Sequence, residues 1–237
     1  MQKVVFITGT GKGIGKALAE NFIKHNWLVY GYSRTNKIKH PKFKFIYTDL
    51  AKFNSKTIFS FPQITHCSEV LLINNAARLG TIVPLYKKKT VDIIDEYTIN
   101  TISPTILCNA FLKQFKNIKK TIINISSGAA ENSIPSWSTY CSSKAALDML
   151  TKVIAKEKYE KLKIFSISPG VVDTNMQKEI RAAKKEDFPL AEKFSSYFTN
   201  NELESTEIVA LKIYYILENS DKFDQNIVSI RDINIIK

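Results

Sequence analysis

The chain has 237 residues, which is enough for one large domain with a complete hydrophobic core. Apolar residues make up 44% and charged residues 24%, and this balance excludes disordered, collagen-like and coiled-coil proteins. The 34 basic residues exceed the 22 acidic ones, and the net charge of +12 raises the question of a nucleic-acid or membrane partner.

The kind of basic residue argues against both partners. Only four of the basic residues are arginine, whereas specific phosphate and base recognition depends on the guanidinium group. We therefore expect a solvated, lysine-rich surface and no nucleic-acid partner. No apolar run approaches 18 residues, so we expect no membrane span. The start of the chain has no signal-peptide pattern, and three cysteines without disulfide or metal-ligand spacing predict a cytoplasmic protein without a metal site.

Seven short apolar runs predict β-strands, and several are continuous, as expected for a parallel sheet covered on both faces. These runs are residues 4–7, 27–32, 43–47, 70–73, 121–125, 164–167 and 227–230. Helical patterns lie between them at residues 14–25, 91–112, 140–158 and 206–219. The alternation predicts an α/β fold, a doubly wound parallel sheet of about seven strands in a single domain over residues 1–237.

Two connections depart from this alternation. Residues 33–42 are too few for a full crossover helix between the second and third strands. Residues 176–201 are polar, charged and aromatic without a clear period, and such a long excursion in a compact domain is often a binding loop. We predict that this segment is a substrate lid. Its aromatic residues suit an aromatic substrate, and its basic residues suit an acidic substrate. The alternative is that the aromatic residues belong to the hydrophobic core and the basic residues are solvated.

Half of the eight glycines lie within seven residues, between the first strand and the first helix. Gly9, Gly13 and Gly15 match the pattern Gly-x-x-x-Gly-x-Gly, whereas Gly-x-Gly-x-x-Gly fails because residue 14 is isoleucine. Glycines at this place let the backbone approach a pyrophosphate, whose charge the helix N-terminus stabilises. The alternative is an ordinary tight turn, but the strand-turn-helix context favours a dinucleotide site.

The residues at the end of the second strand indicate which dinucleotide the site binds. Sites that select NAD usually carry an acidic residue there, on the ribose 2′-hydroxyl. In this chain the strand ends at Ser33 and Arg34, and no acidic residue occurs between Glu20 and Asp49. An arginine and a serine suit a 2′-phosphate. We therefore expect NADP(H) rather than NAD, the alternative being that Arg34 is a solvated loop charge.

A second set of residues has the spacing of a catalytic site. Tyr140 and Lys144 are four residues apart and share one helix face, where the lysine ammonium is expected to lower the tyrosine pKa and ready the phenol for proton transfer. Ser127 follows the fifth strand, at the sheet edge where α/β proteins bind ligands, and its hydroxyl can orient a carbonyl oxygen. Asn100 lies in a helical stretch, and we expect it to hold a water that relays protons to Lys144. Each residue alone has an ordinary structural explanation, and their joint order makes the pattern specific.

Together with Asn74-Asn75-Ala76 and Pro169-Gly170-x-x-x-Thr174, these motifs resemble the short-chain dehydrogenase/reductase family over nearly the whole chain. The resemblance implies a Rossmann domain, a nicotinamide cofactor and four catalytic residues, Asn100, Ser127, Tyr140 and Lys144. It implies a homodimer or homotetramer formed through the Asn100 and Tyr140 helices. The expected cofactor-binding residues are Gly9, Thr10, Gly11, Lys12, Gly13, Ile14, Gly15, Ser33, Arg34, Asp49, Leu50, Asn75, Ala76, Tyr140, Lys144, Pro169, Gly170, Val172 and Thr174.

Residues 126–130, 137–149 and 168–181 resemble the benzil reductase branch of this family, which is close to the sepiapterin reductases. The resemblance implies an NADPH-dependent carbonyl reductase that transfers hydride to a ketone or 1,2-diketone, with Tyr140 as proton donor. Two alternatives stay open. One is another short-chain reductase or dehydrogenase with a sepiapterin, 3-oxoacyl or alcohol substrate. The other is a non-enzymatic NADP(H)-binding regulator, which would have no need of Tyr140 and Lys144 together.

Overall fold

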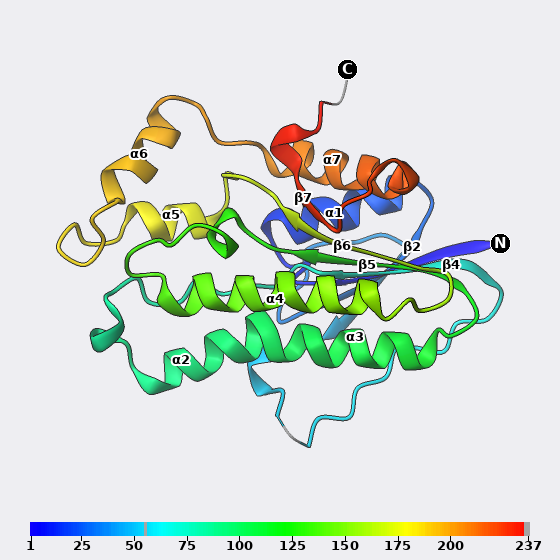
Figure 1. The fold of residues 1–237 in the computed structure, drawn as a ribbon. Helices are drawn as coiled ribbons and strands as arrows, with labels where there is room; N and C mark the ends of the chain where they lie inside the picture. Colours follow the sequence, from blue (N-terminus) through cyan, green and yellow to red (C-terminus); the bar gives the residue numbers. More distant parts are fainter. Residues whose placement is uncertain (55, 235–237) are drawn as a thin grey trace.

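The computed structural model, which describes residues 1–54 and 56–234, is built on one parallel sheet (Figure 1). Its seven strands follow the spatial order β3-β2-β1-β4-β5-β6-β7, and every neighbouring pair is parallel. This order confirms the predicted doubly wound fold, because the chain builds outward from β1 to one side and then from β4 to the other. The strands are β1 (Gln2–Thr8), β2 (Leu28–Ser33), β3 (Phe43–Tyr47), β4 (Cys67–Asn74), β5 (Lys119–Ile125), β6 (Leu162–Ser168) and β7 (Ile227–Ser229).

Helices cover both faces of the sheet. Figure 1 shows α1 and α7 side by side on one face and α3 and α4 side by side on the other. The short helices α5 and α6 extend from one end of the sheet. The helices are α1 (Gly13–Lys24), α2 (Thr90–Tyr97), α3 (Ser103–Gln114), α4 (Ser138–Lys156), α5 (Asn175–Arg181), α6 (Ala191–Thr199) and α7 (Thr206–Glu218).

The strands are continuously apolar because helices cover both faces of the sheet. Side chains alternate between the two faces of a strand, so β1 sends Val5 and Ile7 into the core beneath α1 and α7. Val4 and Phe6 point to the opposite core, beneath α3. All four side chains are fully buried. A strand with one solvated face would instead alternate apolar and polar residues.

The predicted helix over residues 91–112 is interrupted in the structure. It divides into α2 and α3, with a π-helical turn at Thr98–Ile102 between them. The cause is Pro104, which has no N–H to donate to the carbonyl of Asn100, four residues earlier. A π-turn widens the helix and is often found at functional sites.

The two unusual connections behave differently. Residues 34–42 contain no helix, as their number predicts. Residues 176–201 contain most of α5 and all of α6, which the sequence did not reveal because helices of seven and nine residues are too short to establish a period. Both short helices pack through a cluster of buried aromatic residues. Trp137, just before α4, stacks on Phe188 with ring centroids 5.7 Å apart and contacts Phe194 of α6 at 5.2 Å.

A buried ion pair lies beneath the loop that leads into α2. The Lys88 ammonium donates to both carboxylate oxygens of Glu96, at 2.6 and 2.7 Å, and the two side chains are only 1% and 0% exposed. The Thr139 hydroxyl, one residue before Tyr140, donates to the same carboxylate. Gly80 covers the pair with a φ of +75°, where a Cβ would collide with Glu96. The pair therefore connects this loop to the start of α4.

Removing one member of this pair is expected to destabilise the protein strongly. The variant Lys88→Met leaves a buried carboxylate without its cation, and the free energy of unfolding should fall by about 3–5 kcal/mol. Urea denaturation measures the loss. The double variant Lys88→Met/Glu96→Met removes both charges and should recover much of it. A loss below about 1 kcal/mol in the single variant would show that the carboxylate finds water or another partner.

Candidate active site

The glycine loop lies at the carboxyl end of β1 and opens α1. Gly9 has a φ of +77°, a left-handed conformation that favours glycine, and its N–H donates to the Tyr32 carbonyl at 2.7 Å. A Cβ on Gly15 would collide with the carbonyl oxygen of Gly9, so α1 can begin this close to the strand only with glycine there. The resulting cradle of backbone at a helix N-terminus fits the pyrophosphate of a dinucleotide.

Two neighbouring segments support the loop. The Thr8 hydroxyl oxygen accepts hydrogen bonds from the backbone N–H groups of Asn75 and Ala76, at 2.9 and 3.0 Å. The Asn75 side chain donates back to the Thr8 carbonyl at 2.9 Å. Thr10 and Ser33 share a hydroxyl–hydroxyl hydrogen bond of 3.2 Å. These contacts fix the ends of β1, β2 and β4 relative to one another.

One cleft of about 1910 Å³ runs along the carboxyl ends of the strands. It is lined on one side by the glycine loop and the ends of β2 and β3, and on the other by Ser127, Tyr140 and Lys144. Arg34, Lys12 and Lys37 line the end beyond β2. The cleft therefore has a basic end beside the glycine loop and an opposite end that holds the proposed catalytic side chains.

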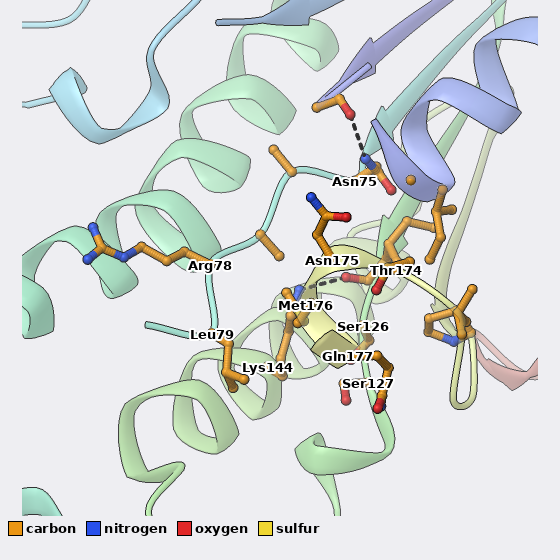
Figure 2. Close-up of a pocket in the computed structure, with 18 of the residues that line it drawn as sticks. Asn75, Arg78, Leu79, Ser126, Ser127, Lys144, Thr174, Asn175, Met176 and Gln177 are labelled. Carbon is orange, nitrogen blue, oxygen red and sulfur yellow. Dashed lines mark hydrogen bonds between the residues drawn. The ribbon is translucent and has the colours of Figure 1, made fainter. Parts of the chain in front are cut away.

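Ser127, Tyr140 and Lys144 occupy the cleft wall formed by β5 and α4. The Lys144 ammonium donates to the Ile125 carbonyl at 2.8 Å (Figure 2) and lies 5.7 Å from the centre of the Tyr140 ring. Ser127 follows β5 directly, and its hydroxyl oxygen accepts from the Ala129 N–H at 3.1 Å. Helix α4 places Tyr140 and Lys144 on the same face because they are one turn apart.

The expectation that Lys144 lowers the Tyr140 pKa is wrong for this arrangement. Burial raises the pKa of Tyr140 to about 12, and only the neighbouring Ser127 side chain opposes that rise. Burial also lowers the pKa of Lys144 to about 8, which the Asp148 carboxylate partly offsets. Removal from water disfavours both charged forms, and it is the largest cause of each shift. Tyr140 is therefore a protonated phenol at neutral pH.

The Asn100 side chain makes all of its hydrogen bonds within the protein. Its side-chain oxygen accepts from the Arg78 N–H at 2.9 Å, and its amide donates to the Arg78 carbonyl at 2.8 Å and to the Ser143 hydroxyl at 3.1 Å. It is fully buried and is not among the residues that line the cleft. The side chain is thus used to hold the segment at Arg78, and it has no amide hydrogen left for a relay water.

The structure brings most of the predicted cofactor residues to the cleft, and Thr10 and Gly15 support it from behind. The residues that line it are Gly9, Gly11, Lys12, Gly13, Ile14, Ser33, Arg34, Asp49, Leu50, Asn75, Ala76, Tyr140, Lys144, Pro169, Gly170, Val172 and Thr174.

Sequence reasoning missed further residues of the cleft, among them Gln177 on α5, Trp137 before α4 and Arg231 near the end of the described chain. Trp137 and Gln177 lie in segments that carry the family resemblance, but nothing in the sequence assigns them to the cleft, because the packing of the 176–201 segment and of the chain end brings these positions there. Within residues 1–54 and 56–234, no group of three or more His, Cys, Asp or Glu side chains is placed to hold a metal ion. In that same part of the chain, no helix has the length and apolar character needed to cross a membrane.

Comparison with known proteins agrees with this geometry. A sequence model of the short chain dehydrogenase family matches residues 3–185. The chain is 35% identical to a benzil reductase ((S)-benzoin forming) of Bacillus cereus, over 92% of this chain and 95% of that protein. It is 34% identical to the Bacillus subtilis (strain 168) protein of the same name, over 91% of this chain and 93% of that protein.

Among solved structures, 4-hydroxyisoleucine dehydrogenase complexed with NADH has the same fold. It superposes with a TM-score of 0.78 at 24% identity, covering 95% of each chain. The family match spans most of the chain and includes the glycine loop and the Ser127, Tyr140 and Lys144 wall. The protein therefore belongs to the short-chain dehydrogenase family and is an oxidoreductase that acts on the CH–OH/C=O pair.

Proposed function

We propose that the protein is an NADPH-dependent carbonyl reductase that converts a 1,2-diketone such as benzil to the hydroxyketone. The observation that carries this proposal is that Ser127, Tyr140 and Lys144 share one cleft with the glycine loop. The resemblance to benzil reductases along nearly the whole chain supports the substrate class. The aromatic cluster around Trp137 and Phe194, at the same end of the cleft as Tyr140, provides apolar walls for a phenyl ring.

The residues of the cleft divide the chemistry between them. A bound reduced nicotinamide would supply the hydride that the carbonyl carbon receives. Ser127 orients the carbonyl oxygen by hydrogen bonding, and Tyr140 donates its phenolic proton to the same oxygen. The raised pKa of Tyr140 suits this role, since the proton is present at neutral pH. Protonated Lys144 then stabilises the phenolate as it forms.

The proposed function is tested with purified protein, benzil and NADPH. Loss of NADPH absorbance together with formation of benzoin supports it, and chiral chromatography of the benzoin gives the stereochemical outcome. Sepiapterin, a 3-oxoacyl thioester and simple alcohols with NADP⁺ are the competing substrates in the same assay. Turnover of one of these and not of benzil would assign the enzyme to another reductase or dehydrogenase of the family. Binding of NADPH without turnover of any substrate would favour a regulator.

The preference for NADPH rests on the basic end of the cleft. Arg34 and Lys12 line it, and the Asp49 carboxylate, which also lines the cleft, accepts a hydrogen bond from the Ala51 N–H at 3.3 Å. The Ser33 hydroxyl donates to the Thr35 carbonyl at 2.6 Å, which fixes the turn that carries Arg34. A 2′-phosphate bound there would meet cationic donors, which a ribose hydroxyl does not require.

The variant Arg34→Ser is expected to raise the KM for NADPH by about 10-fold to 100-fold, because a hydrogen bond to a charged group is lost. The KM for NADH should change little, since its ribose carries no phosphate. Lys24→Ser, which removes an exposed charge at the far end of α1, is the matched control. Equal losses for the two cofactors would show that Arg34 does not recognise the 2′-phosphate, and no loss for either would show that it is a solvated charge.

Two further expectations remain predictions. A homo-oligomer through the Asn100 and Tyr140 helices is supported by apolar side chains that α2 and α4 leave exposed, Ile94 on the first and Met149 and Val153 on the second. A cytoplasmic location is supported by the cysteine content of the chain.

A further inference from the structure

One buried carboxylate beside Lys144 takes no direct part in the proposed proton transfer. Asp148 lies on α4, lines the cleft and is only 8% exposed. It follows Lys144 by four residues, so the two side chains share one face of the helix, one turn apart. Removing an ionised carboxylate from water is costly, and buried charges in native proteins are normally paired with another group.

The neighbouring strand fixes the position of this carboxylate. The Ser166 hydroxyl, on β6, donates to Oδ1 of Asp148 at 2.5 Å, and Ser166 is fully buried. Strand β6 packs against α4, so this contact joins the helix to the sheet. The carboxamide oxygen of an asparagine could accept the same hydrogen bond. The contact with Ser166 therefore does not itself require a negative charge at this position.

The group that benefits from the charge is Lys144. Its ammonium is only 2% exposed and donates to the Ile125 carbonyl at 2.8 Å. Burial lowers the pKa of Lys144, and the charge of Asp148 is the cause that opposes this shift. A nearby opposite charge favours the charged form of a lysine. Asp148 is thus placed to act on the ammonium through its charge.

The acidic groups of α2, the neighbouring helix, are bound to cations of their own. Asp92 and Asp95 bind the Arg78 guanidinium at 2.7 and 2.8 Å. Glu96 is the buried partner of Lys88. Charges that are neutralised in this way have little field left to act on Lys144.

None of the other titratable groups around Lys144 is a buried carboxylate. Glu131, which follows the turn at Ser127, is exposed. The strand lysines start β5 and β6, at the opposite end of the sheet from the cleft. Besides Tyr140 and Cys141 on α4 itself, the groups are Tyr97 on α2, Cys108 and Lys113 on α3, and Lys119, Lys120 and Lys163 on the strands. Among the acidic groups of these elements that the structure describes, Asp148 alone is buried without a cation bound to it.

We propose that Asp148 is a positioning residue whose carboxylate keeps Lys144 in the ammonium form that stabilises the Tyr140 phenolate. The catalytic part of this inference rests on the proposed function. Without the carboxylate, burial acts on Lys144 unopposed, and the ammonium is lost at a lower pH. Carbonyl reduction would then fail closer to the neutral range.

The first test follows Lys144 directly and requires no turnover. In protein labelled with carbon-13 at the lysine Cε atoms, the NMR signal of Lys144 is identified by its absence from Lys144→Met. Asp148→Asn keeps an acceptor for Ser166 and removes the charge, and the midpoint of the Lys144 titration should fall by about 1 pH unit. Asp148→Ala, a second neutral variant, should shift the midpoint in the same direction. Glu157→Gln, which removes an exposed carboxylate just past the end of α4, is the matched control and should leave it unchanged.

The second test measures kcat for benzil reduction as a function of pH. In Asp148→Asn, the pH at which kcat falls should move down together with the NMR midpoint. At pH values well below both midpoints, kcat should equal that of the wild type, because Lys144 is then protonated in both proteins. A merely structural role of Asp148 would instead lower kcat by the same factor at every pH.

The outcomes separate this inference from the proposed function. A lower midpoint with a displaced kcat profile supports the inference. A midpoint that stays in place, a midpoint that moves without displacing kcat, or an equal loss of kcat at every pH overturns it, while the proposed function stands. A wild-type enzyme that does not reduce benzil overturns the proposed function, and the NMR midpoint then decides by itself whether Asp148 keeps Lys144 protonated.

Discussion

Replacing Tyr140 with phenylalanine is expected to lower kcat for carbonyl reduction by about 10²-fold to 10⁴-fold, the usual contribution of a positioned acid. The phenol is fully buried beside Ser127, and its pKa of about 12 keeps it protonated in the physiological range. Phenylalanine fills the same space against Trp137, whose ring centre lies 5.7 Å from that of Tyr140. The loss should therefore come from the missing proton and not from repacking.

The readouts for this variant separate chemistry from binding. Single-turnover kinetics should show a slow reduction step, and fluorescence titration should give an unchanged Kd for NADPH. Tyr159→Phe, an exposed tyrosine beyond the end of α4, is the control and should retain full activity. If Tyr140→Phe reduces benzil at the wild-type rate, another group donates the proton and the catalytic assignment is wrong.

Much of the fold could be predicted because its signals are local. Continuous apolar strands such as the one around Val4 and Val5 arise from burial on both faces, and the structure places these two side chains in opposite cores. The glycine loop could also be predicted, because this turn requires glycine: a Cβ on Gly15 would collide with the Gly9 carbonyl. Backbone sterics and periodicity act over a few residues, so they leave a readable pattern.

The parts that the sequence did not reveal depend on contacts between distant segments. The Asn100 side chain forms hydrogen bonds with the backbone of Arg78, which lies far from it in the sequence. The π-helical turn at Asn100 results from Pro104, and no spacing rule connects that proline with the site. Gln177 lines the cleft because α5 packs there, which leaves its side-chain oxygen buried and without a hydrogen-bond partner among the described residues. The direction of the Tyr140 pKa shift follows from the extent of burial, which a helical spacing of four residues does not specify.

The charge of the chain illustrates the same division. A net charge of +12 in itself is compatible with a nucleic-acid surface, a membrane surface or a solvated exterior. The structure places Lys12, Arg34 and Lys37 along one end of the cleft, where they can attract an anionic cofactor. Lys88 and Lys144 are buried and act within the protein. The role of each of these basic residues therefore depends on where it lies in the fold, and the composition of the chain does not give that position.

Lys144 provides the second prediction of large effect, and it is one of pH dependence. Burial lowers the pKa of Lys144 from its ordinary value of 10.5 to about 8, so the ammonium is present below that pH and is lost above it. Because the ammonium stabilises the phenolate that forms on Tyr140, the rate of carbonyl reduction should fall as the pH rises through about 8. Lys144→Met should lower the rate about 10²-fold to 10³-fold and abolish this fall.

The same shift has a thermodynamic consequence with a definite sign. Between pH of about 8 and 10.5 the unfolded chain holds a proton on Lys144 that the folded protein has lost, so the free energy of unfolding should rise with pH across this window. Denaturation at several pH values should show that rise in the wild-type protein and not in Lys144→Met. Lys152→Met, which replaces an exposed lysine on the same helix, is the control.

The pH dependence of the reduction rate has its own contradicting outcome. If the rate still falls near pH 8 in Lys144→Met, a different group titrates there, because methionine has no proton to lose.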